Sequence, residues 1–445
     1  MQERKTAGKG KIPRPAWRDE KFHRLAQPPY GGRSGKGGTS VKRLLTLLCA
    51  LLLVTLPARA VEVEAPSAVL MERDTGTVLF EKDAHTPREP ASVTKVMTLL
   101  LVMEAIDSGA LHWDDTVTGS AHAASMGGSQ IWLKEGEALS VADMVKAVCV
   151  VSANDCAVAL AEHLAGSEEA FVERMNERAR ELGMEDTRFV NACGLPAEGH
   201  VTSAYDIALM SRELVLRHPD IRQYTTLWMD TLRDGQSSLV NTNKLVRFYP
   251  GCTGLKTGST STAGYCVSAT AEKDGMELIA VILQGNTSAQ RFEDAKTLLN
   301  FGFATYALCP LTPGEALPPI PVTLGAQATV QPLAEEAKLL LEKAKATDLE
   351  QSLDLPERLE APVQTGDRLG TLIVTRQGET VAEIPILAAE DVPRISWKDL
   401  SLRLLRTALF AGEQYSFLIK IFDFYQEGAA VSVALLRQSA AKAVS

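Results

Sequence analysis

The sequence has little that would bind a metal ion. Its seven cysteines form no C-x-x-C pair, and its seven histidines are scattered without an H-E-x-x-H motif. A chain of 445 residues with so few cysteines is also no small disulfide scaffold. We therefore expect mostly buried thiols, no metal ion and no other cofactor.

Basic residues are scarce beyond the N-terminal segment. Residues 1–43 contain twelve Lys or Arg and three Asp or Glu, whereas residues 61–445 contain 33 basic and 52 acidic residues. Nucleic-acid binding needs a basic surface that contacts phosphate groups. Composition therefore argues against a nucleic-acid partner. The hydrophobic content, 45%, is that of a folded protein with a sizeable core.

The N-terminal region lacks an apolar run of membrane-spanning length. Residues 44–56 are apolar, but a spanning helix takes about 20 residues. The run follows the basic Val41-Lys42-Arg43 and precedes Ala58-Arg59-Ala60, so residues 41–60 have the parts of a secretory signal peptide. We expect cleavage after Ala60 and export from the cytoplasm, with a retained anchor as the alternative.

Residues 1–40 differ from the remainder in composition. They are rich in Gly, Lys, Arg and Pro, which is typical of a disordered segment. We expect a disordered basic leader here. Translation from a start near Val41 would leave it out and would place the signal peptide at the N-terminus.

The pattern of apolar residues predicts a domain with strands at its two ends over residues 61–309. Alternating apolar residues around turn residues predict two hairpins, at 67–84 and 265–285. Apolar residues at helical spacing predict helices at residues 92–109, 140–184, 203–217 and 289–306. Between the hairpins the sequence therefore predicts an all-helical insertion.

A Pro-rich stretch, residues 310–322, marks the next boundary because it favours neither a helix nor a central strand. Residues 310–393 are expected to form a small, mostly β domain, since apolar and polar residues alternate around Gly turns. Residues 394–410 predict an amphipathic helix, which either packs on the β domain or lies in a membrane interface. Residues 411–445 are apolar and remain unassigned.

Three short motifs carry the candidate chemistry. Ser92-x-x-Lys95 places a hydroxyl and an amine one helical turn apart, and a neutral lysine can take the proton of a serine. Lys95 opens an apolar run, and burial would lower its pKa as this role requires. Ser152-Ala153-Asn154 and Lys256-Thr257-Gly258 are the only S-x-N and K-T-G in the sequence. A second S-x-x-K at residues 439–442 shows that the first motif alone decides little; the set of three carries the argument.

With these motifs in this order, the chain resembles the serine-type D-alanyl-D-alanine carboxypeptidases, low-molecular-mass penicillin-binding proteins of peptidase family S11. The resemblance covers roughly residues 60–410 and includes the blocks PASVTKVMT, GHVTSAYDIALMSREL, NTNKL and GLKTGSTSTAGYCVSA. It implies an α+β fold: a β-lactamase/transpeptidase-like domain, with an antiparallel sheet flanked by helices plus an all-helical insertion. A small β-rich domain and a C-terminal amphipathic helix follow.

The resemblance also implies catalytic roles for three residues. Ser92 would be the nucleophile that forms an acyl ester, and Lys95 would be its general base. Ser152 would relay a proton to the leaving D-alanine. The alternative is that Ser152 and Asn154 are loop caps.

Substrate binding is implied for five further residues. Asn154 would hold the peptide amide, while Lys256 and Thr257 would bind the terminal carboxylate, with Lys256 also keeping Lys95 neutral. Gly258 would let the substrate backbone approach the strand edge, and the N–H of Ser259 would join that of Ser92 in an oxyanion hole. The alternative for Lys256 is a solvated charge on an edge strand.

The implied reaction removes the C-terminal D-alanine from the peptidoglycan pentapeptide through an acyl-enzyme and so regulates wall cross-linking. The implied partners are peptidoglycan stem peptides, β-lactams as covalent inhibitors, and the outer face of the bacterial cytoplasmic membrane through residues 394–410. Alternatives are a D,D-endopeptidase, a β-lactamase on the same fold, and a non-catalytic wall-binding scaffold. The absence of an E-x-x-L-N motif between S-x-N and K-T-G argues against a β-lactamase.

Two residues near the motifs depart from the family pattern. Thr253 stands where an aspartate is expected, and Cys193 where many relatives have histidine or threonine. These differences bear on substrate preference. Cys252, close to the K-T-G strand, is expected to make the enzyme sensitive to thiol reagents.

Overall fold

The computed structural model describes residues 61–314, 316–345 and 348–409. The expected leader, the expected signal peptide and the unassigned tail lie outside these ranges. No helix within the described ranges combines the length and the apolar character needed to cross a membrane.

A five-stranded antiparallel sheet, in the order β2-β1-β9-β8-β7, forms the framework of the first domain. Its strands are β1 (Ser67–Glu72), β2 (Val78–Lys82), β7 (Cys252–Thr260), β8 (Gly264–Lys273) and β9 (Met276–Gly285). The predicted hairpins are β1–β2 and β8–β9, and pairing of β1 with β9 joins them into one sheet. β7 pairs only with β8, so the K-T-G motif lies on an edge strand.

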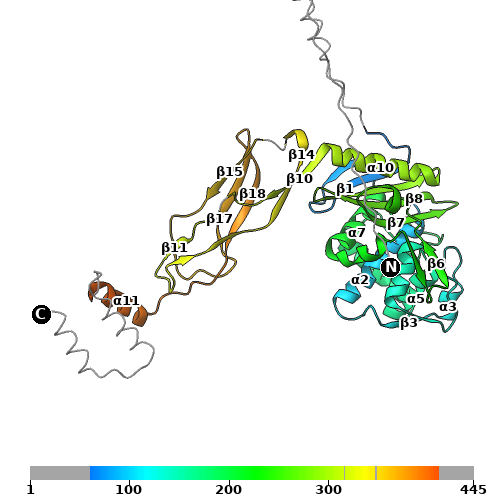
Figure 1. The fold of residues 1–445 in the computed structure, drawn as a ribbon, viewed down its shortest axis with the longest axis horizontal. Helices are drawn as coiled ribbons and strands as arrows, with labels where there is room; N and C mark the ends of the chain where they lie inside the picture. Colours follow the sequence, from blue (N-terminus) through cyan, green and yellow to red (C-terminus); the bar gives the residue numbers. More distant parts are fainter. Residues whose placement is uncertain (1–60, 315, 346–347, 410–445) are drawn as a thin grey trace, which may run out of the picture. The chain divides into compact units, whose positions relative to one another are not determined.

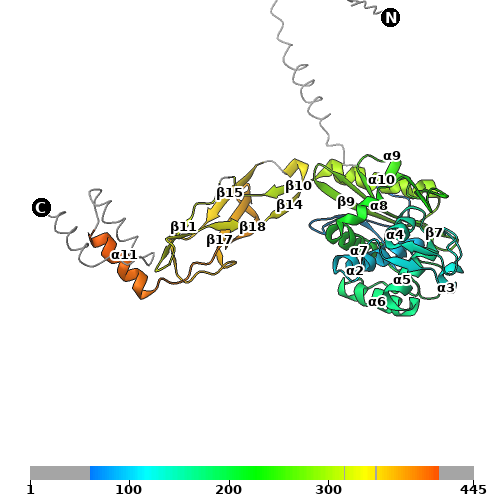
Figure 2. The same cartoon turned by 60° about the horizontal axis from the view of Figure 1, so that its bottom comes forward.

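Helices cover both faces of this sheet, as Figures 1 and 2 show. On one face α10 (Ser288–Thr305) packs through Phe292 and Leu299 against β8 and β9. The larger core on the other face includes α2 (Lys95–Asp107), α4 (Val141–Val150), α5 (Asn154–Ala165) and α7 (Ala204–Arg217). The shorter or more exposed helices are η1 (Ala91–Thr94), α3 (Ala121–Ala124), α6 (Glu168–Glu181), η2 (Pro219–Ile221), α8 (Arg222–Thr225) and α9 (Leu245–Phe248).

Local sequence explains where several of these helices begin. The hydroxyls of Ser140, Ser167 and Ser203 each accept a hydrogen bond from the backbone N–H three residues later. Such an N-cap satisfies a donor that the helix itself leaves free. The predicted N-cap at Ser203 is confirmed.

The insertion is not all-helical, which corrects the sequence prediction. It contains two short antiparallel pairs: β3 (Thr116–Thr118) with β4 (Ala138–Ser140), and β5 (Met229–Leu232) with β6 (Ser237–Val240). Each strand has only three or four residues, and β3 buries Val117 alone. Segments this short give too few alternations to be read from sequence.

The second domain is β-rich, as predicted. Its strands form three small sheets: β10 (Tyr306–Leu311) with β14 (Ala337–Glu342); β12 (Thr329–Val330), β11 (Ile320–Thr323) and β16 (Leu359–Glu360); and β13 (Pro332–Ala334), β18 (Glu379–Ala388), β17 (Arg368–Arg376) and β15 (Leu349–Asp354). A short helix, η3 (Lys343–Lys345), follows β14.

The Pro-rich stretch contains a strand, contrary to the prediction. β11 is the central strand of its small sheet although it includes Pro321. β16 pairs only with Val322 and Thr323, and Pro321 pairs only with Thr329 on the other side. β16 does not extend as far as Pro321, so no strand on that side requires a backbone N–H from the proline.

The predicted C-terminal helix is present as α11 (Trp397–Leu409), and its apolar side chains are largely uncovered. Trp397 is 84% exposed, Leu404 62% and Leu405 44%. Ser396 starts the helix by accepting a hydrogen bond from Asp399 N–H.

A buried carboxylate joins three parts of the first domain. Glu277 on β9 is fully buried, and its side chain forms ion pairs with Arg73 and Arg222. It also accepts a hydrogen bond of 2.6 Å from Thr253 Oγ1. An aspartate at position 253 would place a second carboxylate beside Glu277, which like-charge repulsion disfavours. This contact accounts for the threonine at that position.

We expect Glu277→Gln to lower the free energy of unfolding by about 2–4 kcal/mol, because Arg73 and Arg222 lose their one fully buried counter-charge and keep only Asp74 and Glu272. The matched control is Glu293→Gln, which breaks an exposed pair with Lys296 and should cost less than about 0.5 kcal/mol. Urea unfolding of both variants measures the difference. Equal stability of the two variants would contradict the assignment of Glu277 as a structural charge.

Candidate active site

Ser92 and Lys95 lie on the turn where η1 continues into α2. Lys95 Nζ is 3.0 Å from Ser92 Oγ, within hydrogen-bonding distance. Lys95 is completely buried, whereas Ser92 remains partly accessible. The S-x-x-K spacing therefore places a buried amine directly behind a hydroxyl that a substrate can reach.

Two further oxygen atoms surround the amine of Lys95. Its Nζ donates to the side-chain oxygen of Asn154 and to the carbonyl of Cys193, the latter at 2.6 Å. Once one proton is lost, the two remaining N–H groups can stay on these oxygens. The lone pair is then directed at Ser92 Oγ, which is the geometry of a general base.

Burial lowers the pKa of Lys95 to about 8. An ammonium ion loses hydration when it is buried, and this disfavours the charged form; the nearby Asp155 acts in the opposite direction. The same effect lowers the pKa of Lys256 well below its usual value, and the charge of Lys95 lowers it further. Burial is thus the main cause for both lysines.

Ser152 lies in the short connection between α4 and α5 and has φ +64°, in the left-handed region. Its hydroxyl is buried and has no hydrogen-bond partner among the described residues. A buried hydroxyl without a partner is costly. Ser152 is therefore not a loop cap, and the hydrogen-bonding capacity of its hydroxyl is unused within the described residues.

Asn154 begins α5 and is held on both sides of its amide. Its oxygen accepts from Lys95, and its nitrogen donates to the carbonyl of Gly127 at 2.6 Å. Its backbone N–H donates to Ser129 O at 2.7 Å. These contacts make Asn154 a fixed acceptor for Lys95 and join the S-x-N motif to the 127–129 loop.

The K-T-G motif lies on edge strand β7, with Lys256 and Thr257 both buried. Lys256 is 1% exposed and donates to the carbonyl of Thr257 at 2.8 Å, so it is not a solvated charge. Thr257 Oγ1 lies 2.8 Å from Thr242 Oγ1. The backbone N–H of Thr242 in turn donates to Val150 O, at the end of α4.

The packing around Gly258 gives a second reason for a glycine at this position. A Cβ atom at this position would lie 2.8 Å from both Pro90 O and Ser92 N, and 2.9 Å from Val93 N. These are backbone atoms of the turn that carries the nucleophile. Glycine therefore allows β7 to pack against this turn, apart from any approach of a substrate.

The structure brings four of the eight predicted residues into direct contact. Ser92, Lys95 and Asn154 are joined by hydrogen bonds, and Gly258 contacts the backbone of Ser92. Ser152 is close in the chain to Asn154 but bonds to none of them. Ser259 is exposed at the end of β7, immediately after Gly258.

Sequence reasoning missed the structural roles of Cys193 and Thr242. Cys193 acts through its backbone carbonyl, which no side-chain pattern reveals. Thr242 belongs to the NTNKL block, and this block could have pointed to a residue that contacts the K-T-G motif. Burial raises the pKa of the Cys252 thiol to about 12, which argues against the expected sensitivity to thiol reagents.

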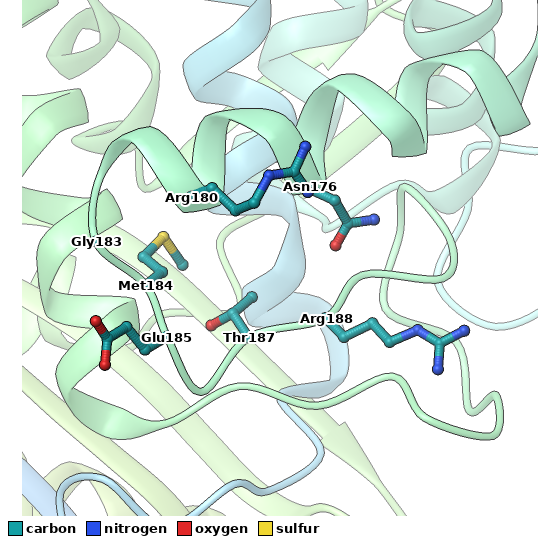
Figure 3. Close-up of a pocket in the computed structure, with 7 residues that line it drawn as sticks. All are labelled: Asn176, Arg180, Gly183, Met184, Glu185, Thr187 and Arg188. Carbon is teal, nitrogen blue, oxygen red and sulfur yellow. The ribbon is translucent and has the colours of Figure 1, made fainter.

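A separate surface pocket of about 600 Å³ lies beside α6 and the loop that follows it (Figure 3). Its lining residues are Asn176, Arg180, Gly183, Met184, Glu185, Thr187 and Arg188. It includes none of the motif residues, so it is distinct from the candidate active site. Among the described residues, no group of three or more His, Cys, Asp or Glu side chains is arranged to hold a metal ion.

Comparison with known proteins identifies the family. The sequence profile of the D-alanyl-D-alanine carboxypeptidases, peptidase S11, matches residues 54–287. The chain belongs to this family. A second profile, the C-terminal domain of penicillin-binding protein 5, matches residues 310–394. The protein is thus a serine-type D-Ala-D-Ala carboxypeptidase with the predicted α+β fold.

Individual relatives agree with this assignment. D-alanyl-D-alanine carboxypeptidase DacF of Bacillus subtilis is 41% identical over 372 residues, covering 80% of this chain and 95% of the relative. The crystal structure of penicillin-binding protein 5 from Haemophilus influenzae has a TM-score of 0.65 at 29% identity, covering 75% of this chain and 98% of that one. Penicillin-binding protein 6B from Escherichia coli has a TM-score of 0.61 at 32% identity, covering 73% and 95%.

We expect the rate constant of acylation by a fluorescent penicillin to rise about tenfold per pH unit below pH 8 and to level off above it. The reason is that the neutral form of Lys95, with its pKa of about 8, increases with pH. Stopped-flow measurements between pH 6 and 9.5 test this. His200, with a pKa of about 4, does not titrate in this range. A pH-independent rate constant would exclude Lys95 as the base.

Proposed function

We propose that the enzyme removes the terminal D-alanine from the pentapeptide stems of peptidoglycan through an acyl ester on Ser92. The observation that carries this proposal is the contact of Ser92 Oγ with the amine of a fully buried lysine, Lys95. A serine hydroxyl needs an adjacent base to become a nucleophile. A lysine with a pKa of about 8 supplies that base near neutral pH.

In the proposed reaction, Lys95 takes the proton of Ser92 as Oγ attacks the carbonyl of the penultimate D-alanine. The backbone N–H groups of Ser92 and Ser259 stabilise the oxyanion of the tetrahedral intermediate. Ser152 passes the proton from Lys95 to the leaving amine, so that the C–N bond breaks and free D-alanine departs. Water then attacks the acyl ester, Lys95 accepts the water proton, and Ser92 regains its hydroxyl.

The unpartnered hydroxyl of Ser152 supports its part in this proposal. Because its oxygen is buried and forms no hydrogen bond among the described residues, a bound substrate or water can use it fully. Asn154 has a role beyond the expected one. Its contact with Lys95 orients the base, and contact with the substrate amide would require its bond to Gly127 to be exchanged.

Substrate binding is proposed along the free edge of β7. An extended peptide can add to an edge strand through backbone hydrogen bonds. Lys256 and Thr257 would then bind the terminal carboxylate, and a positive charge suits this role. A carboxylate beside Lys256 restores the protonated state that burial disfavours. β-Lactams, which carry a carboxylate and a reactive carbonyl, are proposed to acylate Ser92 in the same way.

A D,D-endopeptidase that cleaves cross-links would use the same residues and remains the second candidate. The joint placement of Ser92, Lys95 and Asn154 in hydrogen-bonding contact speaks against a non-catalytic scaffold. A β-lactamase is disfavoured because the chain has a second domain that matches penicillin-binding protein 5.

We also propose that the enzyme is exported and works at the outer face of the cytoplasmic membrane. The signal-like residues 41–60 support export. The exposed Trp397, Leu404 and Leu405 of α11 support binding in a membrane interface, where apolar side chains enter the lipid and arginines meet the head groups.

The first test is mass spectrometry of purified muropeptides after incubation with the enzyme. We expect loss of one alanine from pentapeptides, and no loss with Ser92→Ala, which removes the nucleophile. Ser152→Ala should lower turnover by about 100-fold or more, the usual contribution of a proton relay. It should keep the thermal stability of the wild type, because it removes no hydrogen bond.

Cleavage of cross-linked dimers instead of pentapeptides would favour the endopeptidase. Rapid penicillin hydrolysis without either activity would favour the β-lactamase. Failure of fluorescent penicillin to label the wild type would favour the scaffold.

The second test concerns α11. Cosedimentation with vesicles of mixed zwitterionic and anionic lipid should detect binding of residues 61–445. We expect Trp397→Ala combined with Leu404→Ser to reduce binding at least about tenfold, because the buried apolar area falls. Leu333→Ser, at a residue that is 61% exposed in the β-rich domain, is the control and should bind like the wild type. Equal binding by all three proteins would contradict the proposed anchor.

A further inference from the structure

His200 is a buried histidine outside the three motifs. It lies in the loop ahead of α7 and is 3% exposed. Its Nδ1 is 3.0 Å from the backbone N–H of Val190 and accepts a hydrogen bond from it. Nδ1 therefore carries no proton, and the neutral ring has its N–H at Nε2, 2.8 Å from Thr94 Oγ1.

Thr94 extends this hydrogen bond to the turn that carries the nucleophile. Because Nε2–H donates to Thr94 Oγ1, the hydroxyl proton is free to donate to Ala91 O, at 2.9 Å. Ala91 directly precedes Ser92 and has φ +48°, a left-handed conformation that is strained for alanine. The chain of hydrogen bonds thus ends on the strained residue beside the nucleophile.

The opposite side of this turn is closed by the loop of residues 189–195. A Cβ at Gly194 would lie 1.9 Å from Ala91 O and 2.8 Å from Thr94 Oγ1, so the loop packs directly on the turn. The same loop contains Cys193, whose carbonyl binds Lys95 Nζ, and Val190, which binds His200. His200 therefore connects the turn that carries the nucleophile with the loop that orients the base.

We propose that His200 is a positioning residue for acylation, which acts through Thr94 on the Ala91 carbonyl and so fixes Ser92 Oγ against Lys95 Nζ. The proposal rests on the proposed function of Ser92. Burial and the charge of Lys95 lower the pKa of His200 to about 4, which keeps the ring in the required neutral form at neutral pH. A displacement of about 1 Å at a reacting group can slow a reaction about 100-fold.

Two amide substitutions test the two hydrogen bonds of the imidazole, to Thr94 and to Val190, one at a time. His200→Gln can place an amide N–H near Thr94 Oγ1 but offers Val190 no acceptor. His200→Asn can accept from Val190 N–H but is too short to reach Thr94. We expect acylation by a fluorescent penicillin to slow about 10–100-fold in His200→Asn and less than about threefold in His200→Gln. The dissociation constant of the initial complex should be unchanged in both, because Lys256 and Thr257 are untouched.

A second pair of variants tests the hydrogen bonds of Thr94 to His200 and Ala91 without changing the histidine. Thr94→Ser keeps the hydroxyl, whereas Thr94→Val keeps the shape and removes it. Thr94→Val should slow acylation about as much as His200→Asn, and Thr94→Ser should not. The Thr94→Val/His200→Asn double variant should be no slower than the slower single variant, because residues that act through one contact are not additive.

Stopped-flow fluorescence gives the acylation rate constant and the dissociation constant separately, and thermal unfolding monitors the fold. Slowing in His200→Gln but not in His200→Asn would overturn the proposal, because His200 would then only anchor the loop. Multiplying effects in the double variant would overturn it as well. If the histidine variants do not fold, the Thr94 variants test the proposal alone: equal acylation rate constants for Thr94→Val and Thr94→Ser would overturn it. No acylation of the wild type would instead refute the proposed function.

Discussion

The buried amine of Lys95 is the contact on which the arrangement of the active site depends. It joins Ser92 on the η1–α2 turn, Asn154 at the start of α5 and the carbonyl of Cys193. Each partner comes from a different part of the chain, so the amine holds three segments together. The apolar packing of α2 that excludes water from Lys95 also lowers its pKa. The same burial of apolar side chains therefore stabilises the helical core and lowers the pKa of Lys95.

Two residues near this amine are in costly states. Ser152 and Ala91 have left-handed backbones, and the hydroxyl of Ser152 is buried without a partner among the described residues. Such strain persists only where surrounding packing determines it. Here the support comes from the extensive core under α2, α4 and α5. The domain thus combines a stable framework with a site that is locally strained.

The sequence predicts the parts of this architecture that depend on side-chain type and on the spacing of apolar residues. The hairpins, the main helices and the three motifs could be read because apolar spacing and rare triplets are local signals. The short pairs β3–β4 and β5–β6 escaped because three or four residues hold no measurable period. The role of Cys193 escaped because it uses a backbone carbonyl, and the packing around Gly258 escaped because the clashing atoms come from residues 90–93.

The close packing at Gly258 has a consequence for how such a site can change in evolution. The strand that carries Lys256 and Thr257 touches the backbone of the nucleophile turn, so position 258 cannot accept even one additional carbon atom without a backbone shift. Variation in substrate size must therefore arise elsewhere. The 189–195 loop is equally restricted, because a Cβ at Gly194 would overlap the carbonyl oxygen of Ala91 and because Cys193 binds Lys95. Substitutions in the 127–129 loop, which contacts the site through Asn154, are therefore the ones expected to alter substrate preference.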